Sequence, residues 1–103
     1  MPSTIRGSDN FDSKVIGQEQ SWSDVTGSRA AATLYANTTG RPIMVSIGCT
    51  LNGVVTLTVG GVVAAYAQPW SGSSIITSIS VIVPAGDTYI VSTCTINSWS
   101  ELS

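Results

Sequence analysis

Charge is nearly absent from the second half of this chain. No Asp, Glu, Lys or Arg occurs between Pro42 and Gly86, and eight of the ten charged residues precede that stretch. Uncharged strands expose flat edges that act as templates for pairing with other chains and for aggregation. A protein can carry such strands when neighbouring subunits cover them. We therefore expect an obligate β-rich oligomer.

The lack of histidine and the scarcity of cations exclude several functions. The chain has four Lys and Arg residues and none after Arg41, so it has no basic patch for nucleic acid. Without histidine, the commonest general base and metal ligand is missing. Asp9 and Asp12 could suggest a calcium loop, but the spaced oxygen ligands are absent and a solvated arm is favoured. We expect no cofactor and no metal.

Long hydrophobic runs and paired cysteine motifs are also missing. The N-terminus has no apolar signal region, and no run approaches the roughly 18 to 20 apolar residues of a spanning helix. We expect no membrane insertion and synthesis in a cytoplasm. Cys49 and Cys94 could form one disulfide, but free buried thiols are favoured without an export signal. Their spacing matches no Cys-x-x-Cys motif.

The chain divides into an arm and one domain. Residues 1–19 are polar, charged and without a period, which indicates an N-terminal arm or linker, and residues 20–103 form a single domain. This domain consists of short alternating runs separated by turn residues, which predicts an all-β fold, an antiparallel β-sandwich of about eight short strands. The predicted strands span residues 21–26, 32–36, 41–51, 54–59, 62–68, 73–83, 88–96 and 99–102.

The clearest alternation lies in residues 41–51, with a period of two. Its inward face would carry Ile43, Val45, Ile47, Cys49 and Leu51. The pairs Asn52-Gly53 and Gly60-Gly61 are typical of hairpin turns, so residues 43–68 are predicted to form a three-stranded antiparallel meander. The strand 73–83 carries Ile or Val on both faces, and a small sandwich covers one face only. The second face would be covered by another subunit.

The carboxylates give little sign of catalysis. Asp24 and Glu101 could form the paired acids of a glycoside hydrolase, but no feature near them would raise either pKa. Pairing with Arg29 or Arg41 is the favoured interpretation, and we expect no enzyme. Asn37-Thr38-Thr39 matches a glycosylation pattern, and without a secretory signal it is interpreted as a turn.

The three tryptophans fall in different settings. Trp22 and Trp99 lie in predicted strands and are expected to anchor the core or a subunit contact. Trp70 lies in a predicted loop beside small polar residues. There its ring could stack on a sugar or fold back over the sandwich edge, and both alternatives stay open.

Four segments together resemble a known family. They are QSWSDVTGSR (20–29), YANTTGRPIMVS (35–46), VPAGDTY (83–89) and SWSELS (98–103). In this order and content they resemble the carboxy-terminal receptor-binding tip domain of tailed-bacteriophage tail fibre proteins and related prophage tail proteins. The resemblance covers residues 20–103.

The resemblance implies a trimeric β-sandwich at the distal end of a virion tail fibre. Its partners would be other virion tail proteins and a bacterial surface glycan or outer-membrane protein. A complete fibre also has a virion-attachment region and a shaft, which this sequence lacks, so an excised tip and a small separate gene product stay open. The alternative function is a structural decoration or assembly protein without receptor binding.

Two groups of residues follow from this expectation. The ligand-binding candidates are loop and turn residues, namely Gln68, Trp70, Ser71, Ser73 and Asn52. The structural motif comprises Trp22, Asp24, Arg29, Arg41, Trp99 and Glu101. We expect the four charged members of the motif to form fixed ion pairs that set strand register.

Overall fold

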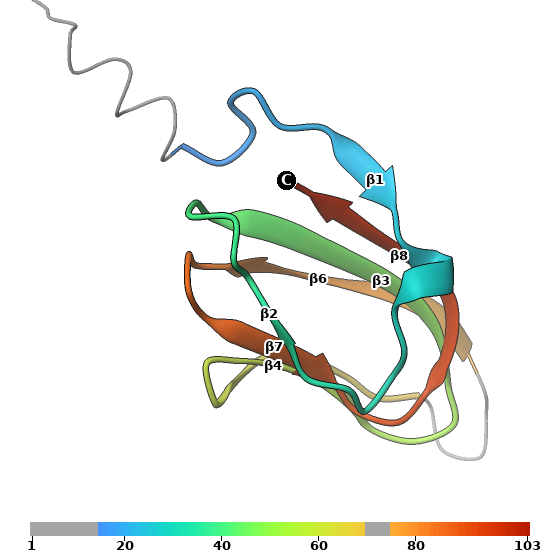
Figure 1. Ribbon diagram of the computed structural model, residues 1–103. Coiled ribbons are helices and arrows are strands. Elements are labelled where there is room, and N and C mark those ends of the chain that lie inside the picture. The colour runs from blue at the N-terminus through green and yellow to red at the C-terminus, as the bar shows by residue number, and fades with distance from the viewer. Residues whose placement is uncertain (1–14, 70–74) are drawn as a thin grey trace, which may run out of the picture.

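The computed structural model describes residues 15–69 and 75–103, which form an all-β fold (Figure 1). Its elements are β1 (Trp22–Asp24), η1 (Thr26–Ser28), β2 (Tyr35–Ala36), β3 (Ile43–Leu51), β4 (Val55–Val59), β5 (Val62–Ala67), β6 (Ile75–Val83), β7 (Thr88–Val91) and β8 (Thr95–Leu102). Within these residues the helix content is the single 3₁₀ turn η1. The predicted all-β class and the number of strands are confirmed.

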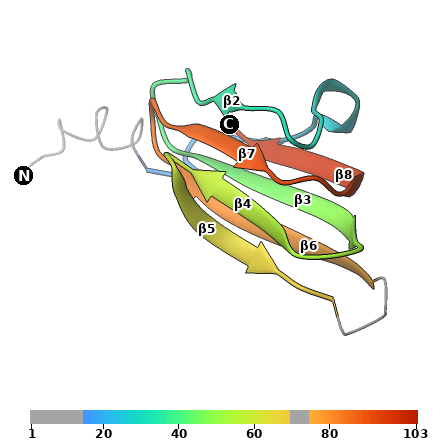
Figure 2. The same cartoon turned by 90° about the horizontal axis from the view of Figure 1, so that it is seen from below.

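The strands form two antiparallel sheets in a sandwich-like arrangement. Sheet 1 has the order β1-β8-β3-β6, and sheet 2 has the order β2-β7-β4-β5. Figure 2 shows β4, β5 and β7 lying over β3, β6 and β8. One core lies between the sheets, and it includes Val45 and Trp99 from sheet 1 and Leu57 and Val91 from sheet 2.

The alternation in β3 is the main source of this core. Each of its five inward residues is buried, and the residues between them are only partly covered. A fully buried aliphatic side chain contributes about 1.5–3 kcal/mol relative to an exposed one. The predicted inward face of residues 43–51 is therefore confirmed.

The predicted meander is wrong at its first turn. β3 pairs with β6 and β8, whereas β4 pairs with β5 and β7. Asn52-Gly53 thus begins a crossing from sheet 1 to sheet 2. The same apolar alternation suits two neighbouring strands or two strands facing each other across a core, so the sequence pattern did not separate them.

The second turn is confirmed. Val59 pairs with Val62 across Gly60-Gly61. Both glycines have positive φ, 58° and 83°, as a type I′ turn requires.

The predicted strand over residues 88–96 is also corrected. β7 ends at Val91, and Ser92-Thr93-Cys94 carries the chain from sheet 2 to sheet 1. The Ser92 backbone N–H donates to the carbonyl of Thr56 at 2.9 Å, and the Ser92 hydroxyl accepts from the Thr56 N–H at 2.9 Å. The first bond continues the β4–β7 pairing by one residue, and in the second the Ser92 side chain takes the place of its backbone carbonyl as acceptor.

Three connections meet at one end of the fold, which we call the loop end. It comprises residues 52–54, 68–69 and 92–94. Each of these segments directly follows or precedes a strand end, and those strand ends are paired with one another: Leu51 with Ile75, Val55 with Ala67, and Thr50 with Thr95. The C-terminus lies at the opposite end (Figure 1). There the backbones of Ser21 and Ser103 exchange hydrogen bonds of 3.3 and 3.2 Å. Across the described residues, no helix has the length and apolarity that a membrane crossing requires.

Candidate functional site

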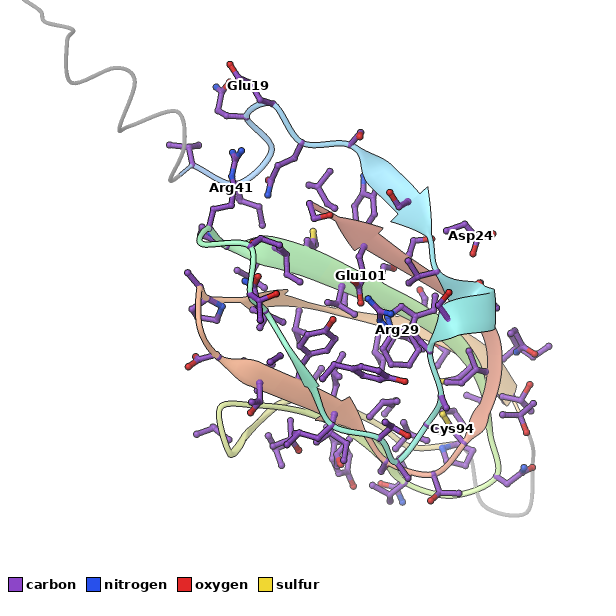
Figure 3. All side chains as sticks on the ribbon, viewed as in Figure 1. Glu19, Asp24, Arg29, Arg41, Cys94 and Glu101 are labelled. Atoms are coloured by element: carbon purple, nitrogen blue, oxygen red, sulfur yellow. The ribbon has the colours of Figure 1, made fainter. Side chains whose placement is uncertain are left out.

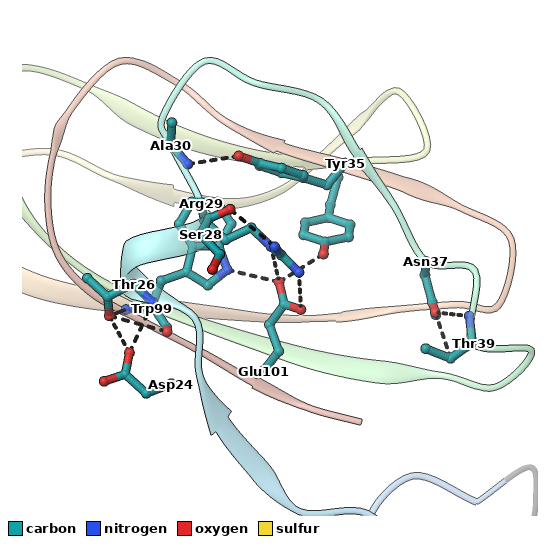
Figure 4. A network of polar contacts seen from close by, with 11 residues as sticks. Asp24, Thr26, Ser28, Arg29, Ala30, Tyr35, Asn37, Thr39, Trp99 and Glu101 are labelled. Atoms are coloured by element: carbon teal, nitrogen blue, oxygen red, sulfur yellow. Dashed lines mark hydrogen bonds and ion pairs between the residues drawn. The ribbon is translucent and has the colours of Figure 1, made fainter.

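The most elaborate polar site in the described residues surrounds Glu101, inside the sandwich (Figure 4). β8 directs Glu101 inward because it pairs with Val45, and only 6% of the residue is exposed. Its carboxylate accepts four hydrogen bonds. Arg29 donates from Nε and Nη2 at 3.1 Å each, the Tyr89 hydroxyl at 2.8 Å and Trp99 Nε1 at 3.0 Å. This buried charge is thus both paired and hydrogen-bonded.

Arg29 reaches this site from the segment that follows η1. Its guanidinium lies 4.9 Å from the centre of the Tyr35 ring and forms a fork on Glu101. The hydrogen bond with Glu101 raises the pKa of Arg29 above its usual value. Arg29 therefore covers one edge of the sandwich with a permanently charged, stacked group.

Aromatic rings join the two sheets at the same place. The Tyr35 ring lies 5.8 Å from the rings of Tyr89 and Trp99, tilted against the first and edge-on to the second. Burial raises the pKa of Tyr89 to about 12, and its hydrogen bond to Glu101 adds to the increase. The Tyr89 hydroxyl therefore stays protonated near neutral pH and donates to the carboxylate. The cluster therefore links sheet 2, through Tyr35 and Tyr89, to sheet 1, through Trp99 and Glu101.

Asp24 does not join this cluster. Because Ser23 pairs with Glu101 and Asp24 with Ser100, the two carboxylates point to opposite faces of sheet 1. Asp24 is exposed, accepts from the Thr26 N–H at 3.0 Å and from its hydroxyl at 2.5 Å, and has a lowered pKa for that reason. No ion pair of Asp24 occurs among the described residues, so its expected pairing is not found. Asp24 and Glu101 therefore do not form a carboxylate pair on one face of the sheet.

Arg41 donates to backbone carbonyls of the segment that precedes β1. Its Nη2 donates to the carbonyls of Val15, at 3.2 Å, and of Gln18. Gln20 Nε2 donates nearby to the carbonyl of Pro42 at 2.9 Å. These bonds fasten the segment before β1 to the start of β3, at the end opposite the loop end (Figure 3).

The two strand tryptophans differ in burial. Trp99 is completely buried in the core, as expected. Trp22 is 52% exposed on the outer face of sheet 1, so its assignment as a core residue is wrong. A subunit contact for Trp22 stays a prediction.

The buried side chain of Asn37 joins three segments of the chain by hydrogen bonds, whereas the sequence had indicated only a turn at this position. It is 2% exposed, and its Nδ2 donates to the carbonyls of Arg41, Val83 and Pro84 at 2.8, 3.0 and 3.2 Å. Its Oδ1 accepts from Thr39, from the N–H at 3.1 Å and from the hydroxyl at 2.7 Å. The Asn-x-Thr spacing, which suits such a side-chain turn, was the available signal.

Two of the five ligand-binding candidates lie at the loop end. Asn52 and Gln68 are exposed there, whereas Trp70, Ser71 and Ser73 lie outside the described residues. Gln68 Oε1 accepts from the Tyr66 hydroxyl at 3.0 Å, and Tyr66 is 59% exposed. The sequence reasoning missed Tyr66 because it counted residues 62–68 only as a strand.

The loop end has no charged residue, since residues 52–54 and 68–69 lie in the uncharged stretch and residues 92–94 are Ser, Thr and Cys. The described part of the chain holds no group of three or more acidic or thiol side chains that could bind a metal ion. Both cysteines are free thiols there. No family model matches this chain, and neither does any curated protein.

Proposed function

We propose that this chain is the trimeric receptor-binding tip of a bacteriophage tail fibre, or of a related virion protein. Its target is a glycan or an outer-membrane protein on the bacterial surface. One observation carries the proposal. The loop end lies opposite the end where Arg41 fastens the N-terminal segment and where the chain finishes. A fibre tip needs this polarity, with attachment at one end and recognition at the other.

The chemistry of the loop end suits an uncharged ligand. It offers the amides of Asn52 and Gln68, and the exposed ring of Tyr66 lies beside Gln68. Aromatic rings stack on the apolar faces of sugars, and amides hydrogen-bond to their hydroxyls. Binding should therefore depend only weakly on salt. Each site is expected to be weak, and three sites on one tip gain through avidity.

The same surface favours binding without catalysis. Glu101 is committed to four donors inside the sandwich, and Asp24 faces away from it. Neither is at the loop end. One observation supports the alternative, a structural decoration or assembly protein. Apolar residues away from the loop end, such as Ile82 and Val62, are exposed and could contact other virion proteins.

Binding to intact bacteria tests the proposal. Trp70→Ala, Gln68→Ala and Asn52→Ala should each weaken attachment to cells or to arrayed surface glycans while thermal melting is unchanged. Thr38→Ala, an exposed change at the opposite end, is the control and should bind normally. If all three loop-end variants bind like the wild type, the site is wrong. If the folded wild type attaches to no bacterial surface, the structural alternative replaces the proposal.

A further inference from the structure

Each sheet ends in two edge strands, and β6 differs from the other three. β1 and β2 have only three and two residues, and β5 has six residues and an irregular register against β4. β6 has nine residues in an unbroken register against β3, and it contains no charged residue and no proline. Proteins block long edge strands with shortness, bulges, charges or proline. β6 has none of these features, so its open side is suited to pairing with another strand.

The hydrogen-bond pattern shows which backbone groups of β6 point to this open side. In an antiparallel ladder, residue pairs that exchange two backbone bonds alternate with pairs that exchange none. Ser21 and Ser103 exchange two bonds, which fixes the alternation across β8, β3 and β6. The odd-numbered residues of β6 therefore bond β3, and the even-numbered ones direct N–H and C=O to the open side. All four even-numbered residues are exposed, and their backbones bond no other described residue on that side.

The sequence of β6 is self-complementary about its central residue, Ile79. Outward from Ile79 in the two directions, the residues are Ser and Ser, Thr and Val, Ile and Ile, and Ile and Val. An antiparallel second copy centred on the same residue would place Ser78 opposite Ser80 and Ile76 opposite Ile82. Cross-strand pairs of hydroxyl and of β-branched side chains stabilise a sheet. Ile76 and Ile82 are 75% and 52% exposed in the single chain.

The same register also pairs the free backbone groups. The residues that oppose each other at Ile76 and Ile82, and at Ser78 and Ser80, are the ones whose N–H and C=O point to the open side. Each such pair exchanges two bonds, and the symmetric contact has four of them, so about eight backbone hydrogen bonds form. Ile79 lies opposite its own copy in a pair without hydrogen bonds, where side chains come closest. The two copies of sheet 1 become one continuous sheet.

A second copy of this chain is the partner that these observations favour. Any extended peptide can add a strand to an open edge, but the symmetric order of side chains matches β6 itself. The strand has no charge, so two copies bring no like charges together. The pairing also extends an apolar line on the outer face of sheet 1. In one copy this line is Trp22, Leu102, Met44 and Ile82, and Ile76 of the second copy continues it.

We propose that β6 of one copy pairs antiparallel with β6 of a second copy, about a two-fold axis at Ile79. This contact goes beyond the proposed function and does not depend on it. Because the strands are antiparallel, the two loop ends lie at opposite ends of the pair. Pairing alone gives a dimer, whereas a trimer that also pairs in this way has six copies, with two-fold and three-fold axes.

Light scattering on charge variants tests the register. Ile76→Lys combined with Ile82→Lys brings like charges opposite each other and should halve the mass of the wild-type assembly, from two copies to one or from six to three. Ile76→Glu combined with Ile82→Glu should do the same. An equal mixture of the two variants should recover the wild-type mass, because each new ammonium then faces a carboxylate. Leu34→Lys combined with Val54→Lys, at residues 61% and 47% exposed outside β6, is the control and should keep that mass.

Proline separates backbone pairing from side-chain contact. Ser80→Pro removes an N–H that points to the open side, so β6 keeps its bonds to β3 and the circular dichroism spectrum should be unchanged. The mass of the assembly should again be halved. Ser80→Ala is the matched control, because it removes the same hydroxyl but keeps the N–H, and it should have the wild-type mass.

The outcomes separate this contact from the proposed function. A monomeric or trimeric wild type, or one whose mass the β6 variants leave unchanged, overturns the pairing, and the trimeric result leaves the proposed function standing. A dimer that the variants dissociate supports the pairing and removes the trimer from the proposed function. If the variants do not fold, hydrogen exchange in the wild type decides. Slow exchange of the Ser78 and Ser80 amides supports the pairing, and exchange as fast as that of exposed loop amides overturns it.

Discussion

At the scale of single residues, Glu101 shows how a charge is retained in this apolar core. An isolated buried carboxylate would be strongly unfavourable, but this one accepts four hydrogen bonds, two of them from the cation Arg29. Removing one partner of a buried pair costs more than the pair contributes, because the remaining charge loses its compensation. The stability of the sandwich should therefore respond sharply to Arg29.

Replacing Arg29 with Met should lower the free energy of unfolding by about 3–5 kcal/mol, because the buried Glu101 carboxyl loses its cation and two of its four hydrogen bonds. Asp24→Ala, which removes an exposed acid that bonds only Thr26 in the described residues, is the control and should leave the urea midpoint close to that of the wild type. Urea unfolding at one fixed protein concentration measures both. Adding Glu101→Gln to Arg29→Met should recover part of the loss. If Arg29→Met and the wild type had the same free energy of unfolding, the structural role of the Arg29–Glu101 pair would be contradicted.

Alkaline pH should weaken the fold through Tyr89. Folding raises its pKa from about 10 to about 12, so the neutral phenol is favoured in the native state. That stabilisation is complete below pH 10 and is lost as the pH rises towards 12. Burial and the neighbouring Cys49 also raise the pKa of Cys94, to about 11, so its contribution declines from about pH 9. Tyr89→Phe should be less stable at pH 8 and lose less stability between pH 10 and 12, as followed by urea midpoints. Parallel pH curves for the two proteins would contradict this.

At the scale of elements, two dipeptides that both signal a tight turn, Gly60-Gly61 and Asn52-Gly53, have different roles. Gly60-Gly61 closes the β4–β5 hairpin with positive φ at both positions, and Asn52-Gly53 begins the crossing between sheets. The reason lies outside both turns. β3 already has partners on both sides, β6 and β8, and so β4 cannot pair with it.

This difference has a direct test. Gly61→Ala should cost about 1–2 kcal/mol, because an L residue is strained at a φ of 83°. Gly53→Ala should be nearly neutral, since no heavy atom lies within 4 Å of the added Cβ and Gly53 has no positive φ. Gly60→Asn should fall between them, because asparagine tolerates the left-handed region. Thermal melting of the three variants gives the order. A large loss of thermal stability in Gly53→Ala would contradict this prediction, and it would indicate a tight turn at Asn52-Gly53 that requires glycine.

At the scale of the whole molecule, the last strand holds the fold together. β8 lies between β1 and β3 and supplies both Trp99 and Glu101 to the centre of the sandwich. A segment at the end of a chain is often dispensable, but not when its backbone is paired on both sides.

Deleting residues 99–103 should therefore abolish cooperative unfolding and the near-ultraviolet circular dichroism of the aromatic cluster. Without Trp99 and Glu101, Arg29 and Tyr89 lose their shared partner and β1 loses its neighbour. Deleting only Ser103, which is exposed and has backbone bonds to Ser21, is the control and should melt close to the wild type. A cooperative, stable protein without residues 99–103 would refute the central role of β8.

The sequence by itself determined the all-β class, most strand positions and the inward face of β3, because a period of two is a local property of consecutive residues. It also singled out the charged motif residues. Only the tertiary structure decided which strands pair, that Glu101 faces inward with Arg29 while Asp24 faces outward, and that Trp22 lies in line with Ile82. Those relations join residues that are far apart in the sequence, such as Arg29 with Glu101 and Trp22 with Leu102, and they depend on strand order, which alternation leaves undetermined.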